Sequence, residues 1–210
     1  MTFMTPTRRL LAPLAVTLAL AAPISIKPAL ATTTPHDTSI VPAGTYMVEP
    51  AHTQILFAVD HLGFSTYYGN FSGASGSLTF DPGAVTRSAL SISVPTGSVS
   101  TTDASLTDKL KNANWLDAQK YPAITFVATQ IAVTGGGTGT ITGNLTLHGV
   151  TRPVTLDATY HGAGPNAADH KYALGFDATG TLSRAAFGVS TYEPFIGDSV
   201  KIIISAAFEK

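Results

Sequence analysis

Hydrophobic and polar residues alternate along most of this chain with a period of two. The segment Thr53–His61 (TQILFAVDH) shows the pattern clearly, because one of its faces is apolar up to a final histidine. That face carries Ile55, Phe57, Val59 and His61. Successive side chains of a β-strand point to opposite sides of the sheet, so the pattern predicts a strand with one face turned toward an interior.

The same alternation returns at short intervals, separated by residues that are typical of turns. The predicted strands are Thr45–Val48, Thr53–His61, Tyr67–Phe80, Ala89–Pro95, Ile124–Val133, Thr138–Leu147, Arg152–His161, Tyr172–Leu182 and Val200–Phe208. Gly135-Gly136-Gly137 is one of the separating turns, since glycine adopts backbone conformations that other residues avoid. A single helix is predicted at Thr102–Leu116, where charged residues mix with leucines and Thr102 could cap the first turn.

This succession of strands predicts an all-β fold. Antiparallel strands in this number form either a sandwich or a closed barrel, and closure removes the exposed edges of the sheet. A barrel of about eight strands has room inside for packed side chains or for one small ligand. The chain contains 10 phenylalanines, 7 tyrosines and 19 glycines, which favours an interior with space beside its aromatic side chains.

The N-terminal residues 1–31 have the organisation of a secretory signal peptide. Arg8 and Arg9 precede an apolar run, Leu10–Ala22, and a small-residue cleavage site ends at Ala31. A membrane anchor is the alternative, but the run is shorter than the roughly 20 apolar residues of a spanning helix. We therefore expect cleavage after Ala31 and export to the periplasm, with no membrane span left in the mature chain.

The mature chain is expected to contain a flexible lead-in at residues 32–43 and one barrel domain at residues 44–210. Cleavage removes three basic residues and no acidic residue, so the formal net charge changes from −1 to −4. A mildly acidic protein does not suit nucleic acid, which attracts basic surfaces. The absence of cysteine excludes disulfides, a thiol nucleophile and thiolate metal ligands.

The sequence lacks the common motifs of catalysis and metal binding. The nearest match to a nucleophile elbow, Gly73–Ser77, has the wrong spacing, and Gly135–Gly139 lacks the lysine of a phosphate-binding loop. The six histidines are His36, His52, His61, His148, His161 and His170. None of them forms an i,i+2 pair on a strand or an i,i+4 pair on a helix, so we expect neither a metal site nor a cofactor.

Arg184 stands in a stretch with little charge, shortly before Phe187, which predicts that its guanidinium is partly enclosed. An enclosed guanidinium needs acceptors for its N–H groups. These acceptors could be backbone carbonyls or an acid such as Glu193 or Asp198. They could equally be oxygen atoms of a ligand, which the planar guanidinium suits well. The sequence leaves both interpretations open.

Separated motifs follow one another through the predicted domain. They are Tyr46-x-Val48-Glu49-Pro50-Ala51-His52-Thr53, Phe57-x-Val59-x-His61-Leu62-Gly63, Trp115-Leu116-Asp117, Tyr121-Pro122-x-Ile124-x-Phe126, Gly143–Thr151 (GNLTLHGVT), Gly175-Phe176, Leu182-x-Arg184 and Phe187-Gly188-Val189. Together and in this order they resemble the YceI-like family, and the resemblance covers essentially all of residues 44–210. Several separated motifs in family order are specific where any one of them alone is not.

The resemblance implies a lipocalin-like shape, which is an extended, antiparallel, eight-stranded barrel with a helix packed at one end. In this family an apolar tunnel holds a long polyisoprenoid, such as an isoprenoid quinone or a prenyl phosphate, and members are typically small exported bacterial proteins. The sequence departs from the family at Thr107-Asp108-Lys109-Leu110, where relatives often have Asp-x-His-Leu. Lys109 thus replaces a histidine, which puts the headgroup preference in question.

We therefore expect a periplasmic protein that binds, transports or stores a polyisoprenoid lipid without acting as an enzyme. The residues expected to contact the lipid are Phe57, Val59, His61, Phe71, Ile92, Phe126, Leu145, Phe176, Arg184, Phe187 and Ile202. Alternation also places Ala128 on the predicted inward face of Phe126. The first alternative is an enzyme that acts on a lipid-like substrate, with His61 or Arg184 as polar participants. The second is a binding protein whose barrel is filled by its own side chains, and a homodimer is compatible with the sequence in every case.

Overall fold

The computed structural model describes residues 38–210, so the predicted signal peptide lies outside the described residues. In the described part, the chain forms ten strands, one α-helix and four 3₁₀ turns. The strands are β1 (Gly44–Val48), β2 (Gln54–His61), β3 (Ser65–Phe71), β4 (Ser75–Phe80), β5 (Ala89–Pro95), β6 (Ala123–Gly135), β7 (Thr138–Leu147), β8 (Val150–Pro165), β9 (Tyr172–Ser183) and β10 (Ile196–Glu209). The helix is α1 (Ala104–Lys111), and the 3₁₀ turns are η1 (Thr38–Ile40), η2 (Val85–Arg87), η3 (Thr96–Ser98) and η4 (Ala185–Phe187).

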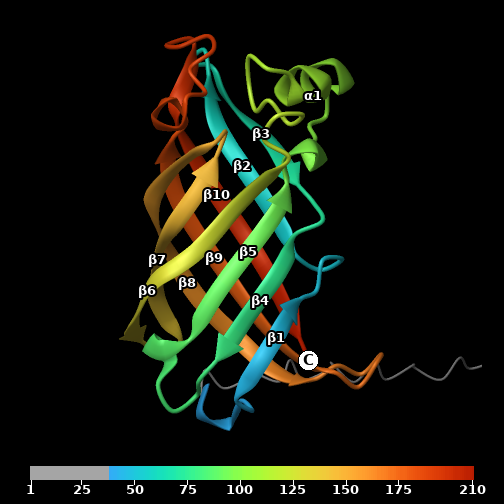
Figure 1. The fold of residues 1–210 in the computed structure, drawn as a ribbon, viewed down its shortest axis with the longest axis vertical. Coiled ribbons are helices and arrows are strands. Elements are labelled where there is room, and N and C mark those ends of the chain that lie inside the picture. Colours follow the sequence, from blue (N-terminus) through green and yellow to red (C-terminus); the bar gives the residue numbers. More distant parts are fainter. Residues whose placement is uncertain (1–37) are drawn as a thin grey trace, which may run out of the picture. The chain divides into compact units, whose positions relative to one another are not determined.

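The strands form one antiparallel sheet that closes into an eight-stranded barrel (Figure 1). β1 and β2 pair with successive parts of β10, while β4 pairs with β1 and β3 pairs with β2. β1–β2 and β3–β4 therefore act as two long strands, each broken once. From β4 to β10 every strand pairs with the next one along the chain, and β10 returns to β1. The predicted all-β barrel is confirmed.

The long strand predicted at residues 67–80 is interrupted in the structure. β3 ends at Phe71 and β4 begins at Ser75, and Gly73 between them has a φ of +69°. This left-handed conformation favours glycine, which has no Cβ to clash with the backbone. The break allows the first part of the chain to pair with β2 and the second part to pair with β1.

A β-bulge in β6 changes which of its side chains face the interior. The register between β6 and β7 shifts between Ala128 and Gln130. Phe126 and Ile131 both line the interior, although strict alternation would place them on opposite faces. Ala128, predicted to share the inward face of Phe126, is not among the residues that line the interior. Ala128 precedes the extra residue and stays in register with Phe126, because their partners on β7 are also two residues apart. It therefore keeps the predicted face, and only its short side chain is absent from the cavity wall.

A compact core closes the end of the barrel that holds the C-terminus, and Figure 1 shows this end opposite α1. Its buried residues are Val41, Tyr46, Leu78, Phe80, Tyr160, Leu174 and Phe208. The hydroxyl of Tyr46 donates to the carbonyl of Pro42 at 2.6 Å, and burial raises the pKa of this phenol. Val41 and Pro42 belong to the predicted lead-in, so the last residues of that segment pack against the barrel.

α1 lies at the other end of the barrel (Figure 1) and is shorter than the predicted helix. Asp103 caps it instead of Thr102, because one carboxylate oxygen of Asp103 accepts the backbone N–H groups of Ser105 (2.8 Å) and Leu106 (3.3 Å). A carboxylate also interacts favourably with the positive N-terminus of a helix. The helix ends at Lys111, and the chain continues from there in turns. No helix within residues 38–210 is long and apolar enough to cross a membrane.

Candidate ligand-binding cavity

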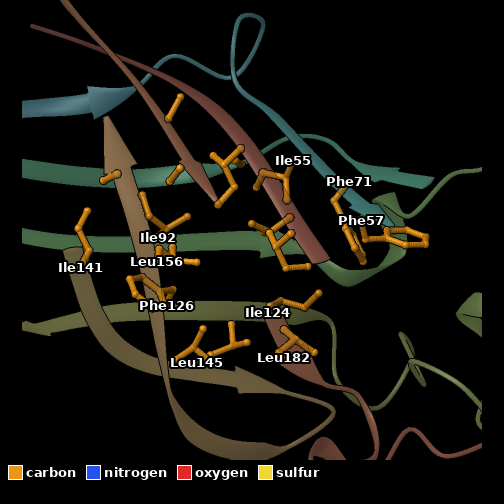
Figure 2. A pocket seen from close by; sticks show the side chains of 18 of the residues that line it. Ile55, Phe57, Phe71, Ile92, Ile124, Phe126, Ile141, Leu145, Leu156 and Leu182 are labelled. Atoms are coloured by element: carbon orange, nitrogen blue, oxygen red, sulfur yellow. The ribbon is translucent and has the colours of Figure 1, made fainter. Parts of the chain in front are cut away.

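A cavity of about 710 Å³ occupies the interior of the barrel. Aliphatic and aromatic side chains form most of its wall, and those labelled in Figure 2 come from strands around the barrel. Ligand pockets in proteins usually have volumes of about 300–1,000 Å³. The barrel is therefore not filled by its own side chains, and its interior can accept a ligand of appreciable size.

Most of the residues predicted to contact a ligand line this cavity. They are Phe57, Val59, His61, Phe71, Ile92, Phe126, Leu145, Phe176, Arg184 and Ile202. They belong to β2, β3, β5, β6, β7, β9 and β10, except for Arg184, which directly follows β9. The fold thus brings these side chains together around one space, and their contact with a ligand stays a prediction.

Phe187 is the exception among the predicted residues, because it does not line the cavity. Its side chain is 2% exposed, and its carbonyl oxygen lies 3.3 Å from Nδ1 of His148 in the β7–β8 turn. The chain leaves β9 at Ser183 and enters η4, so strand alternation no longer decides where Phe187 points. Its place in the family motif reflects packing of η4 rather than a position in the cavity wall.

Other residues of the cavity wall were not singled out from the sequence. From the strands they include Ile124, Ile141, Leu156, Leu182 and Ile204. These are apolar residues of predicted strands, so a fuller use of periodicity could have found them. Leu106 and Leu110 line the cavity from α1, and Trp115, which belongs to one of the family motifs, lines it from the turn that follows the helix. No local pattern in the sequence shows that this segment packs over the barrel.

Two glycines allow phenylalanine rings to lie against the wall of the barrel. Gly69 is the cross-strand partner of Phe57, and a Cβ added to Gly69 would overlap the Phe57 ring. A Cβ added to Gly143 would overlap the Phe126 ring in the same way. Each ring therefore occupies the space above a missing side chain. This arrangement leaves more of the central space free than rings pointing straight inward would.

Basic side chains gather at the α1 end of the cavity. Three basic residues line the cavity at this end, namely His61 at the end of β2, Lys109 on α1 and Arg184 after β9. At the opposite end of the strands, the cavity is lined by glycines of the β6–β7 turn. Lys111 pairs with Asp108, with 3.8 Å between Nζ and Oδ1, but Lys109 has no ion pair among the described residues. The cavity thus has one end without charge and one end with an available ammonium group.

The guanidinium of Arg184 is hydrogen-bonded to backbone carbonyl groups of the protein. Arg184 is 5% exposed, and its N–H groups donate to four carbonyl oxygens. The acceptors are Val189 (2.7 Å), Thr191 (3.0 Å), Ile196 (2.8 Å) and Gly197 (2.9 Å). Since a guanidinium has five N–H groups, one at most remains for a ligand. Of the two interpretations open from the sequence, the structure supports the one in which Arg184 binds backbone carbonyls.

The surroundings of Arg184 keep it charged and in place. Burial lowers its pKa, but the ordinary value is so high that the group stays cationic. Nearby Asp198 accepts the N–H of Ala185 (2.8 Å) and the hydroxyl of Ser183 (2.9 Å), and these bonds lower the pKa of the Asp198 carboxyl. Cζ of Arg184 lies 5.7 Å from the centre of the Trp115 ring, which covers the guanidinium. The predicted helix contains Trp115, but α1 ends at Lys111 and Trp115 lies in the turn that follows.

The five histidines within residues 38–210 are dispersed over the barrel. The His61 ring lies beside that of Tyr67, with 6.1 Å between ring centres, and the His148 ring packs on Tyr121 at 4.8 Å. Across residues 38–210, no three histidine, aspartate or glutamate side chains come together in a group that could hold a metal ion. Among these five histidines, His61 is the one that lines the cavity, and its position there suits contact with a polar headgroup.

Comparisons with known proteins place this architecture among relatives. The family model for the YceI-like domain matches residues 46–208. A UPF0312 protein of Pseudomonas putida is 38% identical over 141 residues, which cover 67% of this chain and 73% of the relative. BcnA of Burkholderia cenocepacia has a crystal structure that superposes with a TM-score of 0.67 at 27% identity, over 76% of this chain and 98% of BcnA. A polyisoprenoid binding domain of Saccharophagus degradans superposes with a TM-score of 0.58 at 11% identity, over 80% of this chain and 99% of that domain, and shows likeness in fold alone.

Proposed function

The chain belongs to the YceI-like family, and on that premise we propose that the protein binds a long-chain polyisoprenoid lipid inside its barrel. It carries or stores this lipid without changing it chemically. The observation that supports the proposal most directly is the cavity of about 710 Å³ with a mainly apolar wall. The choice of a polyisoprenoid is supported by the Saccharophagus degradans domain, a polyisoprenoid binding domain with the same fold.

The cavity wall offers the apolar surface against which a polyisoprenoid tail can be buried away from water. Removing apolar surface from water contributes about 25 cal/mol per Å², before the entropic cost of binding. Side chains such as Phe57, Phe126 and Ile202 offer this surface from separate strands, without directional contacts. Binding energy should therefore be spread over many residues, so that no single apolar residue is indispensable.

The lipid is oriented with its headgroup at the α1 end. Basic groups line the cavity there, while the far end of the barrel is closed by the compact core around Tyr46. A tail that points toward this core buries most of its surface, and its headgroup then lies near His61 and Lys109. Both an isoprenoid quinone and a prenyl phosphate fit this orientation. The free ammonium of Lys109 favours the phosphate, because hydrogen bonds to an ionised group are the stronger ones.

Export to the periplasm is part of the proposal. It is supported by the residues of the N-terminal segment, namely the Arg8-Arg9 pair, the apolar run Leu10–Ala22 and the small residues up to Ala31. Cleavage after Ala31 leaves the whole region matched by the family model in the mature protein. N-terminal sequencing of the protein recovered from the periplasm should therefore begin at Thr32.

The proposed function is tested by asking what the purified protein contains. The mature protein, purified from the periplasm without detergent, should release a polyisoprenoid lipid into organic solvent, as identified by mass spectrometry. The released lipid should then be incubated with the wild-type protein and with His61→Ala. Recovery of intact lipid from both supports a carrier. Conversion of the lipid by the wild type, lost in His61→Ala, would favour the enzyme alternative instead.

A further inference from the structure

Four large apolar side chains are exposed together at the α1 end of the barrel. We refer to them as the apolar tip. They are Leu62 (44% exposed), Phe64 (87%), Tyr192 (66%) and Phe195 (65%). Exposed aromatic side chains on neighbouring turns are unusual on a soluble surface, where such clusters mark sites of interaction. We therefore interpret the apolar tip as a surface that binds a partner.

The tip is built from two segments that lie far apart in the sequence. Leu62 and Phe64 belong to the β2–β3 turn, in which the N–H of Phe64 donates to the carbonyl of His61 at 3.1 Å. Tyr192 and Phe195 belong to the loop that leads into β10. The N–H of Leu62 donates to the carbonyl of Phe195 at 2.8 Å, which joins the two segments. Both lie at the α1 end of the barrel (Figure 1).

The apolar tip is continuous with the mouth of the cavity. His61, immediately before Leu62, lines the cavity, and so does Ile196, immediately after Phe195. Tyr192 belongs to both, because it lines the cavity and is also exposed. A molecule that enters or leaves the cavity at this end therefore passes the four side chains of the tip.

We propose that the apolar tip inserts into the surface of a lipid bilayer and places the mouth of the cavity against the membrane. The proposal rests on the proposed function in that the bilayer is the source or destination of the bound lipid. Phenylalanine and leucine side chains partition into the apolar part of a bilayer, and tyrosine is favoured at its interface with water. A lipid could then pass between bilayer and cavity without exposing its tail to water.

The size of the tip favours a membrane over a second copy of the chain. Aromatic side chains bury about 150–250 Å² each, so four large side chains at these exposures present roughly 500 Å². A stable protein interface needs about 800 Å² from each partner. Side chains that project from two adjacent turns can insert into a lipid bilayer, which deforms around them. A flat protein partner would contact the projecting side chains but few of the residues around them.

The charges around the tip indicate what kind of bilayer it suits. In residues 62–64 and 191–195 the single charged residue is Glu193, so the tip itself has no basic groups, and exposed Lys109 contributes one positive charge beside the cavity mouth. Binding should therefore depend on apolar contact and respond little to salt or to anionic lipid. This response to salt and to anionic lipid distinguishes the proposed apolar mode of membrane binding from an electrostatic mode.

The test uses flotation of the mature protein with vesicles of phosphatidylcholine and phosphatidylethanolamine, with and without phosphatidylglycerol. The wild type should float with both kinds of vesicle. The double variant Phe64→Ser/Phe195→Ser should lose at least about tenfold in vesicle binding, because membrane affinity scales with the apolar area buried. Met47→Ser/Val127→Ser is the matched control, since Met47 (54%) and Val127 (48%) are exposed apolar residues on β1 and β6, away from the tip, and it should bind like the wild type.

Three results would overturn the proposal. They are a wild type that does not bind vesicles, equal binding by the tip variant, and a wild type that sediments as a dimer while Phe64→Ser/Phe195→Ser sediments as a monomer. The last result would show that a second copy covers the tip.

Solvent extraction of the same samples keeps this proposal distinct from the proposed function. A tip variant that contains as much lipid as the wild type, but exchanges it with vesicles more slowly, supports both. Vesicle binding that depends on the tip in a protein without extractable lipid supports membrane docking and contradicts lipid carriage.

Discussion

Two basic residues at the α1 end have different roles, although both line the cavity. Arg184 is 5% exposed and donates to four backbone carbonyls, so it fixes the loop that leads into β10. Lys109 is exposed on α1 and has no ion pair among the described residues. The first residue is therefore expected to affect stability, and the second is expected to affect recognition of the ligand.

Replacement of Arg184 by methionine should destabilise the protein strongly. Arg184→Met leaves four carbonyls without their donor, and we expect the free energy of unfolding to fall by about 3 kcal/mol or more. Urea unfolding followed by circular dichroism measures the change. The matched control is Arg152→Met, because exposed Arg152 also donates to a carbonyl, that of Ala186. The control should lose no more than about 1 kcal/mol, and equal losses would contradict the structural role of Arg184.

Asp198 should make this end of the barrel sensitive to acid. Its bonds from Ala185 and Ser183 lower its pKa in the folded state, so its contribution to stability is complete above the pKa of the unfolded chain, about 3.9. That contribution is lost as the pH falls through the lower pKa of the folded state. Asp198→Asn should be less stable at neutral pH by about 1 kcal/mol and should lose less stability below pH ~4. Urea titrations across this range, with Asp108→Asn as control, measure both effects, and parallel profiles for wild type and Asp198→Asn would contradict this account.

Lys109 should contribute to headgroup recognition. Lys109→Ala is expected to weaken binding of a prenyl phosphate by about 1 kcal/mol, close to fivefold, and to leave binding of a neutral isoprenoid quinone nearly unchanged. Lys111→Ala is the matched control, because Lys111 lies on the same helix but pairs with Asp108 and does not line the cavity. Binding is measured by titration of protein from which the lipid has been removed. Equal effects of the two variants on the phosphate would place the headgroup elsewhere.

At the scale of the elements, the periodicity of the sequence was enough to identify every long strand. It failed where the backbone departs from regular geometry. The bulge between Ala128 and Gln130 has no signature in a single sequence, since neither residue is a glycine or a proline. The position of Phe187 depends on η4, which begins after the last residue of β9. The acceptors of Arg184 are backbone atoms, and only the folded chain brings them together.

The glycines of the strands help to shape the cavity, and Gly143 offers a test. A methyl group at Gly143 would overlap the Phe126 ring and would lie 2.7 Å from the carbonyl oxygen of Val127, so the neighbours must move. Gly143→Ala should cost about 1–3 kcal/mol of stability and push the Phe126 ring toward the cavity centre, which lowers the lipid content. Gly164→Ala in β8 is the matched control, because a Cβ there meets no atom within 4 Å. Denaturation and solvent extraction measure the two effects, and a Gly143 variant that behaves like the control would contradict this account.

At the scale of the whole barrel, one end is closed and the other carries the polar and exposed groups. The core around Tyr46 closes the end that holds the C-terminus, while Lys109, Arg184 and the apolar tip lie at the α1 end. Under the proposed function, this polarity sets one direction for lipid entry and one orientation for the bound lipid. The all-β fold and the inward faces of several strands could be predicted from alternation, and the closed barrel from the family resemblance. The free volume could not, because it depends on how the rings pack against Gly69 and Gly143.

The central claim is that the lipid occupies the cavity, and filling the cavity tests it most directly. Ala178 on β9 lines the cavity and lies opposite Ala158 and Ile204 in neighbouring strands, so a larger side chain there must occupy the lumen. The measurement is the amount of lipid extracted per mole of folded protein from the wild type, Ala178→Trp and Ala123→Trp. Ala123 is the matched control, because it is an exposed alanine in β6 and does not line the cavity. We expect Ala178→Trp to fold and contain little lipid, and Ala123→Trp to match the wild type, whereas a folded Ala178→Trp with full lipid content would show that the lipid is not bound in the barrel.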